Sequence, residues 1–187
     1  GHIMKKGLYG RVSVQKWNKD YLPYADNVVN QIVIRDPGCK IRQEEILRVF
    51  APRGIVIAPE ESRIPKPVSR IGNDFVKFTK PVPAEIDEWT HFLHGPDNNA
   101  VAQDTNVGLP KHVRWIGDPK HARSHEQLAS VSAMVTAQGR VFYIVDEGLR
   151  ADIRMPARWR LVARNAFNGV ILWKRHITKW ADHLHGF

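Results

Sequence analysis

The chain has 187 residues, of which 43% are hydrophobic and 25% are charged, and its net charge is +9. This is an ordinary globular composition, large enough for one domain or two small ones. No stretch approaches the roughly 18 apolar residues of a membrane span, which excludes a membrane protein. The basic residues are scattered rather than grouped, so we interpret them as a solvated surface that would bind nucleic acid nonspecifically at low salt.

The first third of the sequence predicts a small α/β unit. Residues 8–15 alternate like a strand, and the β-branched run at 27–36 is typical of a buried strand. Apolar residues at helical spacing over 41–50, with acids in the first turn, predict a helix. The stretch GIVIAP at 54–59 predicts the next strand.

The middle of the chain is less regular. Residues 60–73 are rich in Pro, Arg, Ser and Gly and read as a linker, and a short strand is predicted within 74–83. Residues 83–95 begin with proline, carry early acids and end with glycine, which predicts a short helix. A long irregular passage follows to about residue 127 and holds most of the histidines.

The hydrophobic period then changes to two. Residues 129–148 form two predicted strands around AQGR, and residues 158–177 form two more around AFNG, so both are predicted hairpins. The predicted fold class is therefore α+β, with a small α/β piece followed by a β-rich region of antiparallel hairpins, similar to one propeller blade.

The single cysteine, Cys39, cannot form a disulfide within the chain. A lone thiol suits a reducing compartment, and no apolar leader follows Met4, so we expect a cytoplasmic protein. Cys39 follows a turn glycine just before the predicted helix, where a thiolate could be stabilised. We interpret it instead as a buried, inert thiol.

Residues 7–59 resemble the second half of a class I S-adenosylmethionine-dependent methyltransferase. The resemblance rests on LPYADNVVNQIVI at 22–34 and on EEILRVFAPRGIVIA at 44–58. They are similar to the family's segment before its fourth strand and to its helix, glycine turn and fifth strand. Arg53 stands where the family usually has the first of two turn glycines. The family's glycine-rich cofactor loop and its ribose-binding acid have no counterpart, so S-adenosylmethionine binding is not expected.

Residues 83–177 resemble the entry segment and first blade of a pyrroloquinoline-quinone-like β-propeller. The resemblance rests on EWTHFLHGPDNNAVAQDTNVGLPKHVRWIGDP from residue 88 and on RLVARNAFNGVILWKR from residue 160. Asn165 replaces the usual Asp of the blade turn, and Trp173 matches the Trp of the strand that follows. One blade cannot close a ring around a quinone pocket, so quinone binding is not expected either.

The order of the two halves resembles a planctomycete-type fusion of a methyltransferase-like region with such a propeller. It implies a methyltransferase-like C-terminal half at 5–59, a linker at 60–82, and a propeller entry segment and first blade at 83–187. The leading functional hypothesis is a non-catalytic structural or interaction fragment, with the missing parts expected in a larger protein. The open strand edges of an incomplete blade predict a homo-oligomer.

The alternative hypothesis is a small metal-dependent hydrolase that uses the loop at 91–126. Eight of the nine histidines lie from this loop onward, most densely in HFLHGPDNNAVAQD at 91–104. Two imidazoles and two carboxylates suit zinc, or manganese with more oxygen ligands, and a metal-bound water could supply the nucleophile. The opposing interpretation is that these side chains cap turns. The candidate ligands are His94, Asp97, Asp104 and His125, with His91 as an alternate.

Two further patterns in this passage leave the question of an enzyme open. The oxygen-rich run at 97–104 could bind calcium, although it lacks the EF-hand spacing. Ser124, His125 and Glu126, with Ser130, suggest a hydrolase triad, but adjacent residues rarely point at one another and no GxSxG motif is present. The tryptophans of this half are interpreted as core and blade packing.

Overall fold

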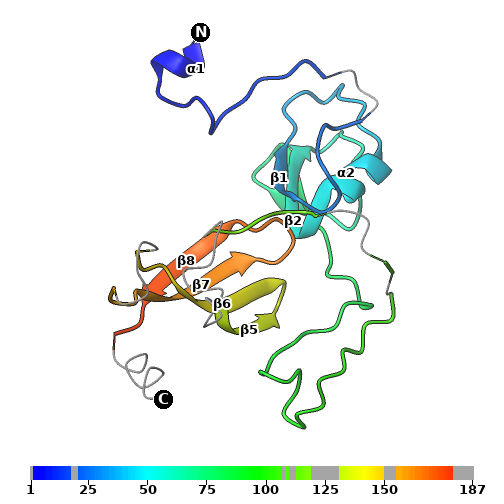
Figure 1. The fold of residues 1–187 in the computed structure, drawn as a ribbon. Coiled ribbons are helices and arrows are strands. Elements are labelled where there is room, and N and C mark those ends of the chain that lie inside the picture. Colours follow the sequence, from blue (N-terminus) through cyan, green and yellow to red (C-terminus); the bar gives the residue numbers. More distant parts are fainter. Residues whose placement is uncertain are drawn as a thin grey trace.

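A computed structural model gives the fold of the chain (Figure 1). Its strands form two separate four-stranded sheets, and two short helices accompany them. This is the predicted α+β class, with antiparallel hairpins in the second half. No helix in the described part of the chain has the length and apolar character needed to cross a membrane. The described residues are 2–17, 21–106, 108–109, 113–118, 131–149 and 155–178.

The first sheet has the strand order β1-β2-β4-β3. β1 and β2 are parallel and are joined through α2, while β2 pairs antiparallel with β4, and β4 with β3. A short helix, α1, lies near the N-terminus. The bounds are α1 His2–Lys5, β1 Val29–Val33, α2 Gln43–Val49, β2 Phe50–Pro59, β3 Ser69–Ile71 and β4 Phe75–Thr79.

The core of this unit lies between α2 and the sheet. α2 contributes Ile46, and β2 contributes alternate residues of one face, as the period of a strand requires. Cys39 is half-buried and packs against this core, as expected for a structural thiol. The buried members are Ile34, Ile46, Phe50, Val56, Ala58, Ile64, Val76 and Phe78.

The second sheet is an antiparallel meander in the order β5-β6-β7-β8. Gln138 and Gly139 join β5 to β6 with φ angles of 52° and 69°, the left-handed pair that a tight type I′ hairpin turn needs. In the turn between β7 and β8, the Asn165 side chain accepts hydrogen bonds from the backbone N–H groups of Phe167 and Asn168. The bounds are β5 Val131–Ala137, β6 Arg140–Asp146, β7 Trp159–Asn165 and β8 Ile171–His176.

The two sheets meet where the β7–β8 turn contacts β1. The Asn168 side-chain amide donates to the Val28 carbonyl and to Asn30 Oδ1, each at 2.9 Å. Asn165 donates to the same Asn30 oxygen at 3.3 Å. Side-chain amides of one hairpin turn therefore bridge to the first strand of the other sheet.

Three local predictions differ from the structure. Residues 8–15 form no strand: 8–12 make a turn, in which Gly7 and Gly10 take φ angles of 65° and 83°, and 13–15 are irregular. Residues 83–95 form no helix, because the Asp87 carboxylate accepts the Glu88 N–H and competes with helical hydrogen bonding. The stretch at 60–73, predicted as a linker, contains β3, which pairs with β4, while the strand predicted within 74–83 is β4, which pairs with β2.

Candidate functional site

The described members of the predicted metal-ligand set lie in a loop whose organising residue is Asp87. The Nε2 atom of His94 lies 2.6 Å from Asp87 Oδ2, so this nitrogen is already hydrogen-bonded to a carboxylate. Asp104 accepts the backbone N–H of Asp87 at 2.9 Å. Asp97 accepts the backbone N–H of Asn99 at 3.3 Å. His91 points elsewhere, with its Nδ1 atom 2.9 Å from the Thr90 hydroxyl.

Asp87 was missed in the sequence because an acid in the first turn of a predicted helix suggests only a favourable dipole interaction. In the structure its carboxylate accepts the backbone N–H groups of Gln103 and Glu88, each at 2.7 Å, as well as contacting His94. The Gln103 N–H, followed by the His94 ring, lowers the pKa of Asp87. The carboxylate thus ties together both ends of a loop that spans 87–103.

The four predicted ligands are therefore not brought together as one set. Within the described residues, no three His, Cys, Asp or Glu side chains are placed to hold a metal ion. His125 lies outside the described residues, as do Ser124, Glu126 and Ser130. The metal site and the hydrolase function stay predictions, while Asp97 and Asp104 accept backbone N–H groups of the loop.

The same loop is attached to the edge of the second sheet. The backbone N–H of Trp89 donates to the Thr136 hydroxyl at 2.8 Å, and the Thr136 N–H donates to the Trp89 carbonyl at 2.6 Å. The Glu88 carboxylate accepts the N–H of Gln138. The Trp89 ring also stands edge-on to His94, with centroids 5.2 Å apart. Residues 88–89 therefore cover part of the β5 edge.

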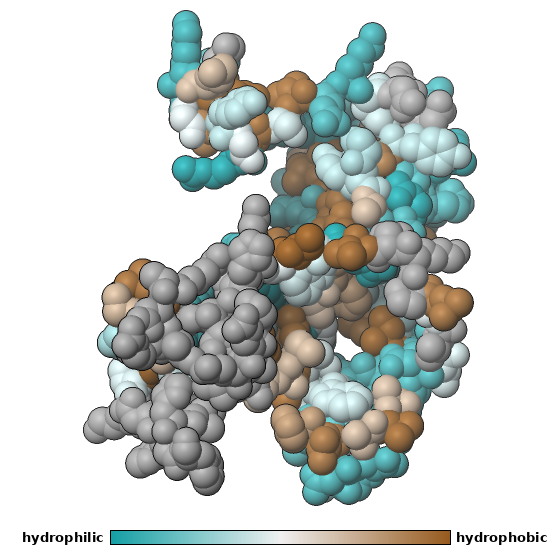
Figure 2. Space-filling model, viewed as in Figure 1, coloured by the Kyte–Doolittle hydropathy of each residue, from teal (hydrophilic) through white to brown (hydrophobic). Residues whose placement is uncertain are grey.

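Apolar side chains lie open to solvent along this loop, which Figure 1 shows below the first sheet. Ile86, Phe92 and Val101 are exposed although they flank the Asp87 cluster. Figure 2 shows brown, hydrophobic patches on the same part of the molecule. The loop is therefore held by polar contacts at its ends rather than by a core of its own.

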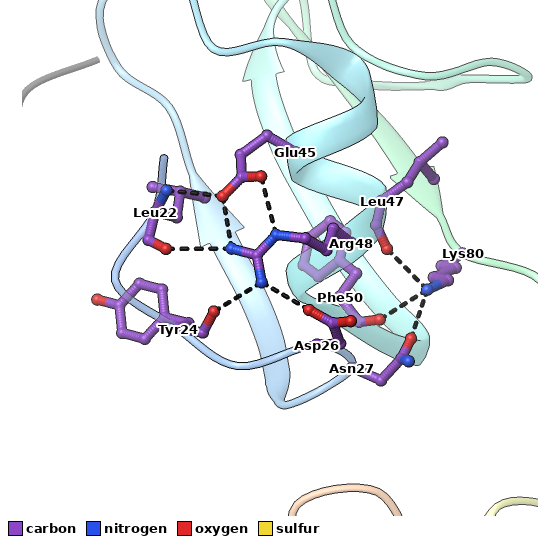
Figure 3. Close-up of polar contacts among 9 residues, drawn as sticks. All are labelled: Leu22, Tyr24, Asp26, Asn27, Glu45, Leu47, Arg48, Phe50 and Lys80. Carbon is purple, nitrogen blue, oxygen red and sulfur yellow. Dashed lines mark hydrogen bonds and ion pairs between the residues drawn. The ribbon is translucent and has the colours of Figure 1, made fainter. Parts of the chain in front are cut away.

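A second polar cluster joins residues 22–26 to α2 (Figure 3). Glu45 is only 4% exposed, and the Arg48 guanidinium beside it lowers the pKa of its carboxyl group to about 2. Arg48 also donates to the carbonyls of Leu22 and Tyr24 and to the carboxylate of Asp26, at distances of 3.2, 2.9 and 2.6 Å. This cluster fixes the chain that leads into β1.

Lys80 performs a similar task on the other side of α2 (Figure 3). Its ammonium donates to the carbonyls of Leu47 and Phe50 and to the side chain of Asn27, at 2.7, 2.8 and 2.7 Å. Burial lowers the pKa of this ammonium. A cation here satisfies carbonyls that the end of the helix leaves without partners.

In the second sheet, the buried Arg164 fills the space between β7 and residues 115–118. Its Nε donates to the Tyr143 hydroxyl and its Nη1 to the Gly169 carbonyl, both at 2.7 Å. The Trp115 indole donates to the Ala166 carbonyl at 3.0 Å and lies against Gly169. These contacts hold one face of the sheet, so Trp115 packs as predicted.

β8 forms the edge of the second sheet opposite β5, and this edge is the candidate interaction surface. Every residue of β8 is exposed, although β7 beside it is mostly buried. Leu172 and Trp173 are 45% and 43% exposed. Among the described residues, no strand pairs with the outer side of β8. The β8 edge therefore combines backbone groups that no described strand pairs with and exposed apolar side chains.

No protein-family model, no curated protein and no solved structure matches the chain. The resemblance of its two halves to a methyltransferase and to a propeller therefore stays a prediction.

Proposed function

We propose that the chain is a non-catalytic structural and interaction module, which pairs through β8 with the same strand of a second copy. The open β8 edge carries this proposal. An edge strand presents unpaired N–H and C=O groups, and proteins usually protect such edges with charges, prolines or covering loops. Residues 88–89 provide a cover at β5, whereas the first three residues of β8 are Ile171, Leu172 and Trp173.

The sequence of β8 favours one register for such a pair. In an antiparallel pair related by a two-fold axis, centring on Trp173 places the two Trp173 rings opposite each other. Leu172 then faces Lys174 of the second copy, and Ile171 faces Arg175. Centring one residue later would place the two Lys174 side chains opposite each other, which is unfavourable. The register centred on Trp173 avoids this repulsion.

The polar clusters support the non-catalytic part of the proposal. The carboxylates of Glu45 and Asp87 and the cation of Lys80 each bind backbone groups that join segments of the fold. Side chains that bind backbone groups in this way stabilise the fold, and they are not available to bind a substrate.

The test is the solution mass, measured by light scattering after size-exclusion chromatography at about 10 to 300 µM, near the range of weak dimers. We expect a dimer that dissociates on dilution. Leu172→Lys places a lysine opposite Lys174 of the second copy and should give a monomer at every concentration. Met134→Lys adds the same charge on β5, where Met134 is 57% exposed, and should leave the dimer intact.

Two results would overturn the proposal. A monomeric wild-type protein at the highest concentration would exclude self-association. A Leu172→Lys variant that stays dimeric, with an unchanged circular dichroism spectrum, would exclude β8 as the interface.

A further inference from the structure

An open groove of about 680 Å³ lies beside the cluster of Glu45 and Arg48. One wall is formed by residues 13–17 and the other by residues 21–24. This volume is within the range of ligand pockets, about 300 to 1,000 Å³. The lining residues are Ser13, Val14, Gln15, Lys16, Trp17, Tyr21, Leu22, Pro23 and Tyr24.

The wall at 21–24 has a fixed backbone. The N–H of Leu22 donates to Glu45 at 2.7 Å, and Arg48 binds the carbonyls of Leu22 and Tyr24. The Tyr21 carbonyl accepts the indole N–H of Trp17 at 3.1 Å, which links the two walls. A preformed wall lowers the entropy cost of binding.

The aromatic rings of this wall are exposed to solvent, because Arg48 and Glu45 bind the backbone of the segment and not its rings. Tyr21 and Tyr24 are 63% and 52% exposed. Figure 3 shows the Tyr24 ring pointing away from Arg48, although its carbonyl points toward it. Exposed rings on a fixed backbone are suited to stacking against another flat, apolar group.

The charge around the groove selects the kind of partner. Among the described residues, the lining includes Lys16 and no acidic side chain. The Arg42 guanidinium lies over the Tyr21 ring, 5.2 Å from its centre, so a cation stands next to one of the stacking rings. Lys5, Lys6 and Arg11 lie on the same N-terminal segment, which shows hydrophilic side chains in Figure 2, and the whole chain carries +9.

We propose that this groove binds single-stranded nucleic acid. Unpaired bases would stack on Tyr21, Tyr24 and Trp17, and the phosphates would pair with Lys16 and the basic segment. Stacking platforms beside basic grooves are how proteins hold single strands without reading their sequence. A proline-rich peptide also suits aromatic grooves, but it offers no negative charge to match this surface. The site is separate from β8, so it extends the proposed function rather than depending on it.

The test uses fluorescein-labelled oligothymidine and oligouridine, with fluorescence anisotropy at about 50 and 200 mM salt. We expect both strands to bind, with lower affinity at the higher salt, and an equally long duplex to bind more weakly. Combining Tyr21→Ala with Tyr24→Ala should weaken single-strand binding by about tenfold or more. The matching pair of Phe substitutions should retain binding, because stacking needs the rings and not the hydroxyls.

Three control variants separate stacking from general charge and from misfolding. Phe92→Ala removes an exposed ring that belongs neither to the groove nor to the basic segment, and should leave the affinity unchanged. Lys16→Gln should weaken binding and reduce its salt dependence, while Lys66→Gln removes the same charge outside the groove with a smaller effect. Circular dichroism confirms that each variant is folded.

Four outcomes would overturn the proposal. They are no binding at low salt, equal binding of duplex and single strand, full affinity in the double Ala variant, and binding of a labelled proline-rich peptide in place of the oligonucleotides.

Discussion

Arg48 grips both carboxylate oxygens of Glu45, three residues earlier on α2, with its Nε atom at 2.9 Å from one and its Nη2 atom at 2.6 Å from the other. Such a two-point contact is stronger and more directional than a single hydrogen bond. Because the same guanidinium also binds Leu22, Tyr24 and Asp26, one side chain sets the path of the segment that forms a wall of the aromatic groove.

Removing the charge of Glu45 should destabilise the first sheet. We expect Glu45→Gln to lower the free energy of unfolding by about 2 kcal/mol at neutral pH, since hydrogen bonds to charged groups contribute roughly 1.5 to 3 kcal/mol. Urea denaturation monitored by circular dichroism measures the difference. Glu44→Gln removes an exposed acid next to it and should have little effect; equal losses in both variants would contradict the role of the pair.

The same pair predicts how stability depends on pH. The folded-state pKa of Glu45 lies near 2, below the ordinary value of 4.5. Its contribution is therefore complete above about pH 4.5 and is lost as the pH falls toward 2. The stability difference between wild type and Glu45→Gln should shrink over this window. A difference that stays constant from pH 6 to about pH 2 would contradict the assignment.

Gly169 should tolerate no side chain. It has a φ of 72°, and a β-carbon there would lie 2.5 Å from the Trp115 ring. We expect Gly169→Ala to cost about 2 kcal/mol or more, from backbone strain and overpacking together. Thermal unfolding measures this loss. Gly108→Ala is the matched control, because a β-carbon at Gly108 meets nothing within 4 Å; a similar loss there would show that the effect is not specific.

Asp87 should protect particular amides of its loop. Asp87→Ala removes the acceptor of the Gln103 and Glu88 N–H groups, so both should exchange with deuterium about tenfold faster or more. Asp97→Ala removes a more exposed acceptor of the same loop and should leave both rates unchanged. Amide exchange followed by NMR resolves the two positions, and unaltered exchange in Asp87→Ala would remove Asp87 from its organising role.

A metal titration separates the leading function from the alternative. Because His94 Nε2 is bonded to Asp87, we expect added zinc, manganese or calcium to leave the melting temperature unchanged, and a chelator to do the same. If the metal-dependent hydrolase is correct, the purified protein will hold stoichiometric metal. Separate His94→Ala and His125→Ala variants will then lose it.

The parts of the fold that follow local patterns were predictable from the sequence. The two hairpins follow from alternation with a glycine at each turn, and α2 with β2 follows from helical spacing that ends in a β-branched run. Arg53 illustrates the limit. It has a φ of 67° inside β2, a conformation that favours glycine, at a break in the register with β1, and its N–H donates to the Lys80 carbonyl at 2.8 Å.

The candidate sites depended on contacts between distant segments, which no spacing encodes. Asp87 and Gln103 are 16 residues apart, and β3 lies in the stretch at 60–73, whose composition favours a linker. The sequence predicted open strand edges in an incomplete blade, but it did not identify β8 as the exposed strand, because apolar strands are usually buried. Only its place at the end of the sheet leaves Leu172 and Trp173 open.

The turn that closes the β7–β8 hairpin has a thermodynamic consequence. Asn168 binds Val28 and Asn30 of the first sheet, and β8 begins three residues later. A strand that pairs with β8 would hold the β7–β8 turn in the conformation in which the Asn168 amide reaches Val28 and Asn30. Association at β8 and attachment of the first sheet are then linked equilibria, and each would strengthen the other by the same free energy.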